Sequence, residues 1–144
     1  MEYNNLVEDA SCVVIIYDDE GKILLQHRDN AAPTAPNKWS FFGGGMESGE
    51  IPVQTAIREI KEELEYDALS PRLVLVRDLQ DHPDFSKEFV FVEKYSGAKL
   101  TLREGDDMGF FAFNETFDLD MVENKKVLLP VLFDYINYLM RNNR

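Results

Sequence analysis

Cysteine, basic residues and long hydrophobic runs are all scarce in this sequence of 144 residues. Cys12 is the single cysteine, so an internal disulfide is excluded, and its apolar surroundings predict a small buried side chain. Lysine and arginine number 15 against 27 acidic residues, and a formal charge of −12 offers no basic footprint for nucleic acid. No apolar run reaches the roughly 18 residues of a membrane span, and the N-terminus lacks a signal-peptide core. We therefore expect no nucleic-acid partner, no membrane contact and a reducing compartment, most simply the cytoplasm.

Hydrophobic residues make up 44% of the sequence, which is typical of a globular protein, and we expect one domain over residues 1–144. The polar residues 1–10 predict a loose lead-in. Apolar runs rich in β-branched and aromatic residues predict strands, and these lie at 11–17, 22–27, 39–42, 72–79, 88–95 and 109–113. The first two strands are expected to form a hairpin. Residues 99–103 alternate polar and apolar side chains.

Two helices are predicted. The first begins at Pro52, which suits a first helical position, and its apolar stripe consists of Val53, Ala56, Ile57, Ile60 and Leu64. The second runs from residue 123 onward, where Pro130 predicts either a kink or a helix that begins near it. Strands do not alternate regularly with helices, so we expect an α/β (α+β) fold in which two helices sandwich a mixed central β-sheet.

Three acidic residues of the first helix need an explanation. Glu59, Glu62 and Glu63 share one helix face, and like charges four residues apart repel by a few tenths of a kcal/mol. A hard cation such as Mg²⁺ would resolve this repulsion, since it prefers carboxylate oxygens, water and substrate phosphates. The alternative is a solvated acidic face supported by Arg58.

The spacing from Gly44 through Glu50 to Arg58, Glu59, Ile60, Glu62 and Glu63 resembles the Nudix box of the Nudix hydrolase family, Gly-x5-Glu-x7-Arg-Glu-apolar-x-Glu-Glu-x-Gly-apolar. The sequence departs from the box at its end, where Glu65 replaces the last glycine and Tyr66 the last aliphatic residue. That glycine normally ends the helix in a left-handed conformation. A glutamate there costs on the order of 1 kcal/mol, unless the helix ends differently.

The resemblance implies a fold, a cofactor and roles for individual residues. It implies a Nudix-type α/β/α sandwich whose Glu59, Glu62 and Glu63 bind Mg²⁺ or Mn²⁺, with the carbonyl oxygen of Gly43 as a further ligand. Glu59 would also orient or deprotonate the attacking water. Arg58 would orient Glu59, and Glu50 would pair with Arg58 or brace the loop.

Residues outside the box are less strongly specified. Glu104 is the expected outside carboxylate ligand, with a turn residue as the alternative and Asp106, Asp107, Glu88 and Glu93 as competitors. Arg28 or Lys38 could meet a terminal phosphate, although surface solvation is equally consistent with each. Phe111 could stack on a base, with core packing as the favoured alternative.

The resemblance implies hydrolysis of a P–O–P linkage in a small nucleoside di- or triphosphate derivative, with a lean toward (d)NTP pyrophosphohydrolase activity. Two alternatives remain: an ADP-ribose or nucleotide-sugar pyrophosphatase, for which Pro83 is weak support, and a non-catalytic Nudix module that senses a nucleotide. Sensing modules typically lose catalytic glutamates, and all are present here. Isomerisation of an isoprenyl diphosphate is disfavoured because it requires more His and Cys. Dimeric relatives suggest a homodimer as one assembly.

Overall fold

The central strand is β1 (Ala10–Tyr17), and the computed structural model describes residues 9–142 around it. All eight residues of β1 are buried. It runs parallel to β6 (Lys87–Lys94) along its whole length. Its first half pairs antiparallel with β4 (Phe42–Gly45), and its last residue with the start of β2 (Ile23–His27), which confirms the predicted hairpin. A strand covered on both faces is expected to read as a continuous apolar run.

The other strands extend the sheet on both sides of β1. β2 pairs antiparallel with β3 (Trp39–Ser40) and with β7 (Asp107–Phe111). β5 (Arg72–Asp78) pairs antiparallel with β6 and forms one edge. The sheet order is β3-β2-β1-β6-β5, with β4 on β1 and β7 on β2, so the mixed sheet is confirmed.

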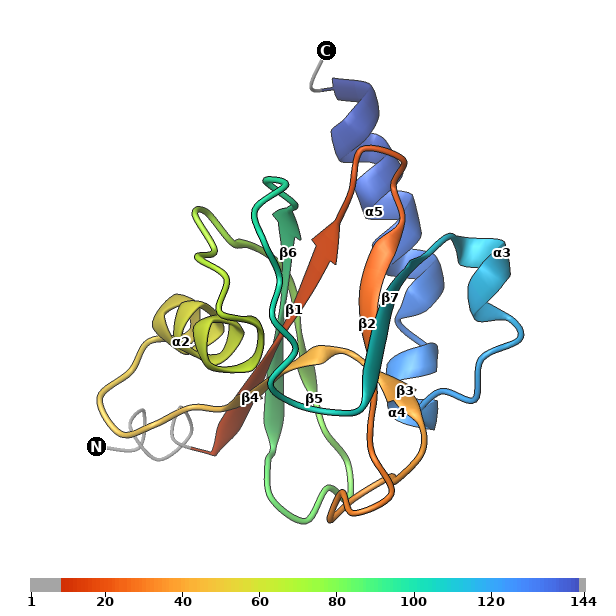
Figure 1. The fold of residues 1–144 in the computed structure, drawn as a ribbon. Coiled ribbons are helices and arrows are strands. Elements are labelled where there is room, and N and C mark those ends of the chain that lie inside the picture. Colours follow the sequence, from red (N-terminus) through yellow and green to blue (C-terminus); the bar gives the residue numbers. More distant parts are fainter. Residues whose placement is uncertain (1–8, 143–144) are drawn as a thin grey trace.

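Helices α2 (Pro52–Leu64) and α5 (Leu129–Asn142) lie on opposite sides of this sheet (Figure 1). Side chains alternate along β1, so Val13 and Ile15 join the core under α5, whereas Cys12 and Val14 join the core under α2. The predicted burial of Cys12 is thus confirmed. Two short helices, α3 (Phe113–Thr116) and α4 (Glu123–Lys126), precede α5.

Several boundaries differ from the predictions for physical reasons. Residues 99–103 form no strand; instead Thr101 and Arg103 donate backbone N–H groups to the carbonyls of Leu64 and Glu63, which would otherwise be free at the end of α2. The last strand ends at Phe111 because its partner β2 begins at Ile23. The helical region breaks into α4 and α5, so Pro130 falls in a first turn that needs no N–H from it.

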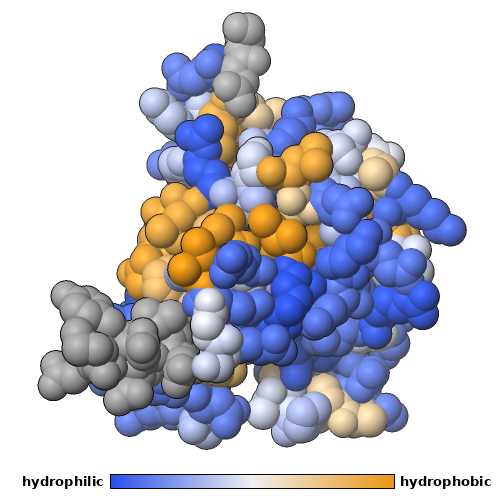
Figure 2. Space-filling model, turned by 90° about the vertical axis from the view of Figure 1, so that its left-hand side faces the viewer, coloured by the Kyte–Doolittle hydropathy of each residue, from blue (hydrophilic) through white to orange (hydrophobic). Residues whose placement is uncertain are grey.

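Most of the predicted lead-in, residues 1–8, lies outside the described part of the chain. No helix between residues 9 and 142 is both long and apolar enough to span a membrane. Figure 2 shows the left-hand side of the Figure 1 view, where hydrophobic residues gather in one zone of a largely hydrophilic surface.

Candidate active site

Glu63 is the most buried carboxylate on α2, with 3% of the residue exposed. Its Oε1 accepts a 2.9 Å hydrogen bond from the backbone N–H of Gly43, which ties β4 to the helix. Its Oε2 is buried and has no hydrogen-bond partner among residues 9–142. Burial, and then the adjacent Glu104 carboxyl, raise the pKa of Glu63 to about 10. Such an oxygen is costly unless a proton or a cation meets it, so it marks the centre of the site.

Two glycines let the backbone of β4 lie directly against its neighbours. A Cβ on Gly44 would stand 2.4 Å from Cδ of Glu59, and a Cβ on Gly43 would stand 2.0 Å from the carbonyl oxygen of Cys12. A side chain at Gly43 would therefore push β4 away from β1, whereas a side chain at Gly44 would displace the Glu59 carboxylate. Burial raises the pKa of Glu59, although its hydrogen bond from Arg58 opposes this shift.

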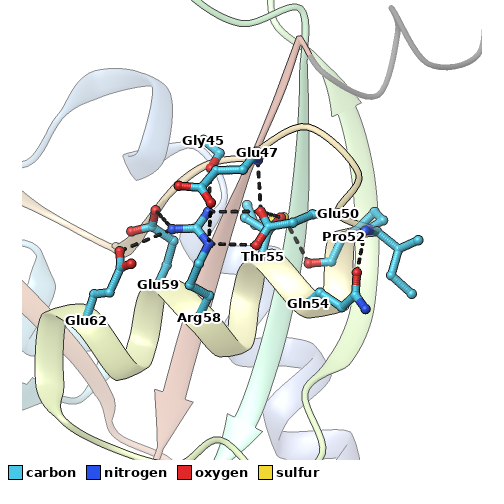
Figure 3. A network of polar contacts seen from close by, with 11 residues as sticks. Gly45, Glu47, Glu50, Pro52, Gln54, Thr55, Arg58, Glu59 and Glu62 are labelled. Carbon is cyan, nitrogen blue, oxygen red and sulfur yellow. Dashed lines mark hydrogen bonds and ion pairs between the residues drawn. The ribbon is translucent and has the colours of Figure 1, made fainter.

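Arg58 is the hub of a polar network between α2 and the loop before it (Figure 3). Its guanidinium donates two hydrogen bonds to Glu50, of 2.7 and 3.0 Å, in a fork-like arrangement. It also donates to Glu59 at 2.9 Å and to the carbonyl oxygen of Gly45 at 2.9 Å. The geometry therefore places Arg58 where it can fix the direction of the Glu59 carboxylate.

Glu50 is held from several sides. Besides Arg58, it accepts 2.8 Å hydrogen bonds from the Thr55 hydroxyl and from the backbone N–H of Glu47. The Arg58 hydrogen bond is the main reason that the pKa of Glu50 falls to about 2. Glu50 thus stays ionised and braces the loop. Thr55 is a hydrogen-bond partner of Glu50 that the sequence pattern did not reveal.

Glu62 lies on the exposed flank of α2, with 57% of its side chain exposed, and accepts a 3.2 Å hydrogen bond from Arg58. Helical spacing brings Glu62 near Glu59 and Arg58 but leaves it less enclosed than Glu63. Within the described part of the chain, no three acidic, His or Cys side chains already converge as a metal-binding group.

Glu104 is the carboxylate from outside the helix that lies close enough to Glu63 to raise the pKa of Glu63 further. The competing acidic residues are engaged elsewhere. Asp106 pairs with His27, and Asp107 accepts the backbone N–H of Met108. Glu88 is paired with Arg77 and Lys125, and Glu93 accepts the N–H groups of Leu69 and Ser70.

A cavity of about 260 Å³ opens beside these carboxylates, and Gly43, Gly44, Glu104 and Arg28 are among the residues that line it. The Arg28 side chain donates to the carbonyl oxygen of Thr34 at 2.9 Å. The two other substrate-binding candidates lie outside its lining. Lys38 pairs with Asp120 at 3.3 Å, and Phe111 packs edge-on against Trp39 next to the core under α5.

The cavity also includes residues that sequence reasoning did not select, above all Lys125. This lysine forms an ion pair with Glu88, which is fully buried and also binds Arg77 at 2.7 Å. A signal for this pairing existed, because Glu88 shares one face of an alternating strand with Val90 and Val92. A charged residue at such a core-facing position requires a partner.

The fold and this arrangement of carboxylates define a Nudix domain, and residues 8–132 match the NUDIX domain family. The chain therefore belongs to the Nudix family.

Individual relatives match over shorter stretches. The dihydroneopterin triphosphate diphosphatase of Escherichia coli is 37% identical over 69 residues, which are 46% of this chain and 43% of that protein. A Bacillus subtilis protein, YjhB, named for a suspected ADP-ribose pyrophosphatase activity, is 30% identical over 106 residues, 69% of this chain and 51% of that protein. The chain thus spans about half the length of these curated relatives.

The fold is shared more widely than the sequence. A crystal structure of a MutT Nudix hydrolase from Burkholderia pseudomallei superposes with a TM-score of 0.71. The superposition covers 85% of this chain and 95% of that one, at 22% identity. This similarity confirms the Nudix-type α+β fold.

Proposed function

We propose that this chain is an Mg²⁺-dependent hydrolase that cleaves a P–O–P linkage in a small nucleoside di- or triphosphate derivative. The proposal rests chiefly on Glu63, a residue of the Nudix box. Its buried Oε2 has no hydrogen-bond partner among the described residues, and the Glu104 carboxyl lies next to it. A buried carboxylate oxygen of this kind suits a hard cation, which would replace the proton that the carboxyl holds in the metal-free protein. Family membership supports the same reaction class.

The donor set fits Mg²⁺, or Mn²⁺ in its place. Glu63, Glu59 and Glu104 would hold the ion, with the carbonyl oxygen of Gly43 as a further ligand and Glu62 completing the set from the exposed flank. When bound, the ion would neutralise charge on the non-bridging phosphate oxygens. All of these groups would offer oxygen atoms, the ligand type that Mg²⁺ prefers.

The remaining roles belong to side chains of the network in Figure 3. Glu59 would accept the proton of the attacking water. To do so, its carboxylate must point at that proton from within hydrogen-bond reach. Arg58 would hold Glu59 in this direction through its 2.9 Å hydrogen bond. Glu50 would keep Arg58 in place from the other side, and so acts as a positioning residue.

Two observations bear on the substrate. The similarity to the Escherichia coli enzyme favours a nucleotide-like triphosphate, in line with the lean toward (d)NTP pyrophosphohydrolase activity. The similarity to the Bacillus subtilis protein favours the alternative, an ADP-ribose or nucleotide-sugar pyrophosphatase. A non-catalytic sensing module is the third candidate, and the retention of Glu59, Glu62 and Glu63 speaks against it.

A substrate panel in ¹⁸O-labelled water tests the proposal. The panel contains dNTPs, oxidised dNTPs, dihydroneopterin triphosphate, ADP-ribose, sugar nucleotides and dinucleotides, each with Mg²⁺ and with a chelator. We expect at least one substrate to release a phosphate-containing product that carries one label, and only when Mg²⁺ is present. A chain that binds nucleotide but turns over no member of the panel would support the sensing module instead.

The cytoplasmic location and the homodimer stay predictions. Cell fractionation tests the first, and sedimentation of the purified chain tests the second.

A further inference from the structure

Glu104 belongs to a short segment of backbone that is anchored on both sides of it. On one side, the backbone N–H of Arg103 donates a 2.8 Å hydrogen bond to the carbonyl oxygen of Glu63, in the last turn of α2. On the other side, the backbone N–H of Asp106 donates a 3.0 Å hydrogen bond to the carbonyl oxygen of His27, the last residue of β2. The segment therefore bridges the helix of the Nudix box and the sheet, with Glu104 between the two anchors.

Gly105 lets this segment lie directly on β2. Its φ of +84° is in the left-handed region that favours glycine. A Cβ at this position would stand 2.5 Å from the carbonyl oxygen of His27 and 3.0 Å from Oε1 of Gln26. The nearer atom cannot give way like the end of a flexible side chain, because it belongs to the backbone of a strand that pairs on both sides. A side chain on Gly105 would therefore lift the segment off β2.

The Asp106 side chain makes a second contact with the same residue of β2. Its Oδ1 forms a 2.7 Å hydrogen bond with Nδ1 of His27. The imidazole of His27 is itself held in place, because it packs edge-on against Trp39 at a ring-centroid separation of 5.1 Å. The backbone and the side chain of Asp106 thus both bind His27, which fixes the direction in which the chain leaves Glu104.

The backbone is what sets the position of the Glu104 carboxyl. This carboxyl lines the cavity and lies close to Glu63, whose pKa it raises beyond the effect of burial. The neighbouring cation of Arg103 pairs with Glu65 instead. Whether Glu104 and Glu63 can share one cation therefore depends on the anchors of the segment.

We propose that Gly105 and Asp106 are positioning residues that hold Glu104 at the metal site, although neither supplies a ligand. Gly105 acts through its lack of a side chain, and Asp106 through its two hydrogen bonds to His27. This inference rests on the proposed function and assigns the proposed cation a support outside the Nudix box. Residues that hold a metal ligand in place typically change metal affinity by about 10–100-fold when they are replaced.

Mn²⁺ binding to the intact, metal-free chain tests the inference, with electron paramagnetic resonance measuring the free ion. We expect Gly105→Ala to weaken Mn²⁺ binding by about tenfold or more. Gly97→Ala is the matched control, because Gly97 has a similar φ of +90°. A Cβ on Gly97 would meet no atom within 4 Å among the described residues beyond its own chain neighbours. This variant carries a similar backbone strain without the contact, so its Mn²⁺ affinity should stay at the wild-type value.

Two further comparisons separate positioning from a general loss of structure. Gly105→Ala added to a Glu104→Gln protein should weaken Mn²⁺ binding by no more than about twofold further, because the ligand that Gly105 positions is already removed. Asp106→Ala should weaken Mn²⁺ binding. Asp106→Asn keeps an oxygen for His27 and should retain the wild-type affinity, which a direct metal ligand would not.

An unchanged Mn²⁺ affinity in a folded Gly105→Ala protein would overturn the inference, and so would an equal loss in Gly97→Ala or in the Glu104→Gln background. If Gly105→Ala does not fold, equal affinities of Asp106→Ala and Asp106→Asn would overturn it. Absence of Mn²⁺ binding by the wild type would do so without any variant. A chain that shows the expected Mn²⁺ pattern but hydrolyses no nucleotide would keep this inference and refute the proposed function. Hydrolysis by a wild type whose Gly105→Ala variant binds Mn²⁺ normally would do the opposite.

Discussion

At the scale of single residues, the Glu63 carboxyl is protonated in the metal-free protein at neutral pH, because burial and Glu104 raise its pKa to about 10. The unfolded chain releases this proton near pH 4.5, so the folded state binds more protons between about pH 4.5 and about 10. Stability must therefore fall as the pH rises through this window, by at most about 1.4 kcal/mol per pH unit for one proton.

Glu63→Gln should remove this slope. The amide has nearly the shape of the protonated carboxyl and does not ionise, so the free energy of unfolding should depend less on pH than in the wild type. Urea unfolding at pH 6, 7.5 and 9 without divalent metal measures the effect. Glu123→Gln, an exposed residue on α4, is the matched control and should keep the slope. A Glu63→Gln protein with the wild-type slope would show that Glu63 is ionised.

Arg58 gives a second prediction at this scale. Arg58→Lys keeps the charge but loses the planar fork that holds Glu50 and Glu59 together. We expect kcat to fall roughly 10–100-fold while the protein stays folded, because a side chain that orients a catalytic group is replaced. Steady-state kinetics measure the change, and Lys61→Arg on the exposed flank of the same helix is the control. Unchanged kcat in Arg58→Lys would refute the orienting role.

At the scale of elements, the end of α2 shows how the sequence departs from the Nudix pattern. Glu65 adopts the left-handed conformation with φ 53°, so the helix ends as in the family and the glutamate bears the backbone cost. The Glu65 side chain forms an ion pair with Arg103, on the segment that also caps the helix. Both side chains are well exposed, so this pair offsets little of the cost.

Glu65→Gly should accordingly raise the free energy of unfolding by about 0.5–1 kcal/mol, since glycine reaches this conformation without strain. Arg103→Ala removes the ion pair alone and should lower stability by no more than about 0.5 kcal/mol. Chemical denaturation of both variants separates the two effects. A loss of stability in Glu65→Gly would mean that the ion pair outweighs the strain.

The sequence predicted helices and strands well where the apolar residues of one segment alone show which of its faces is buried. The buried run of β1 and most of the apolar stripe of α2 are confirmed, because each reflects how a single element meets the core. Ile57, which the stripe included, is exposed instead and does not join the core. The alternation of polar and apolar side chains at residues 99–103 does not reveal that the N–H groups of Thr101 and Arg103 close the end of α2. Pairing between distant segments, such as that of Glu88 with Lys125, depends on how β6 and α4 come together in space. In the sequence, its one indirect sign is a charged residue on the core-facing side of a predicted strand.

At the scale of the whole molecule, the chain carries a formal charge of −12 and is proposed to act on an anionic substrate. A cation at Glu63 would replace the proton that this carboxyl holds, so its binding should couple to both pH and stability. We expect Mg²⁺ to raise the melting temperature, and to raise it more at pH 8.5 than at pH 6.5. Thermal melts across Mg²⁺ concentrations measure this, and Glu63→Gln should lose most of the shift. A shift that is equal at both pH values would show that no proton is displaced.

The most direct test of the central claim is turnover by the wild type and by Glu63→Gln, measured side by side with Mg²⁺ as the release of phosphate or pyrophosphate from the preferred nucleotide. We expect turnover by the wild type and a loss of at least about 10³-fold in Glu63→Gln, with both proteins equally folded. A Glu63→Gln protein that keeps full activity would contradict it, because the buried carboxylate at the centre of the site would then take no part in the chemistry.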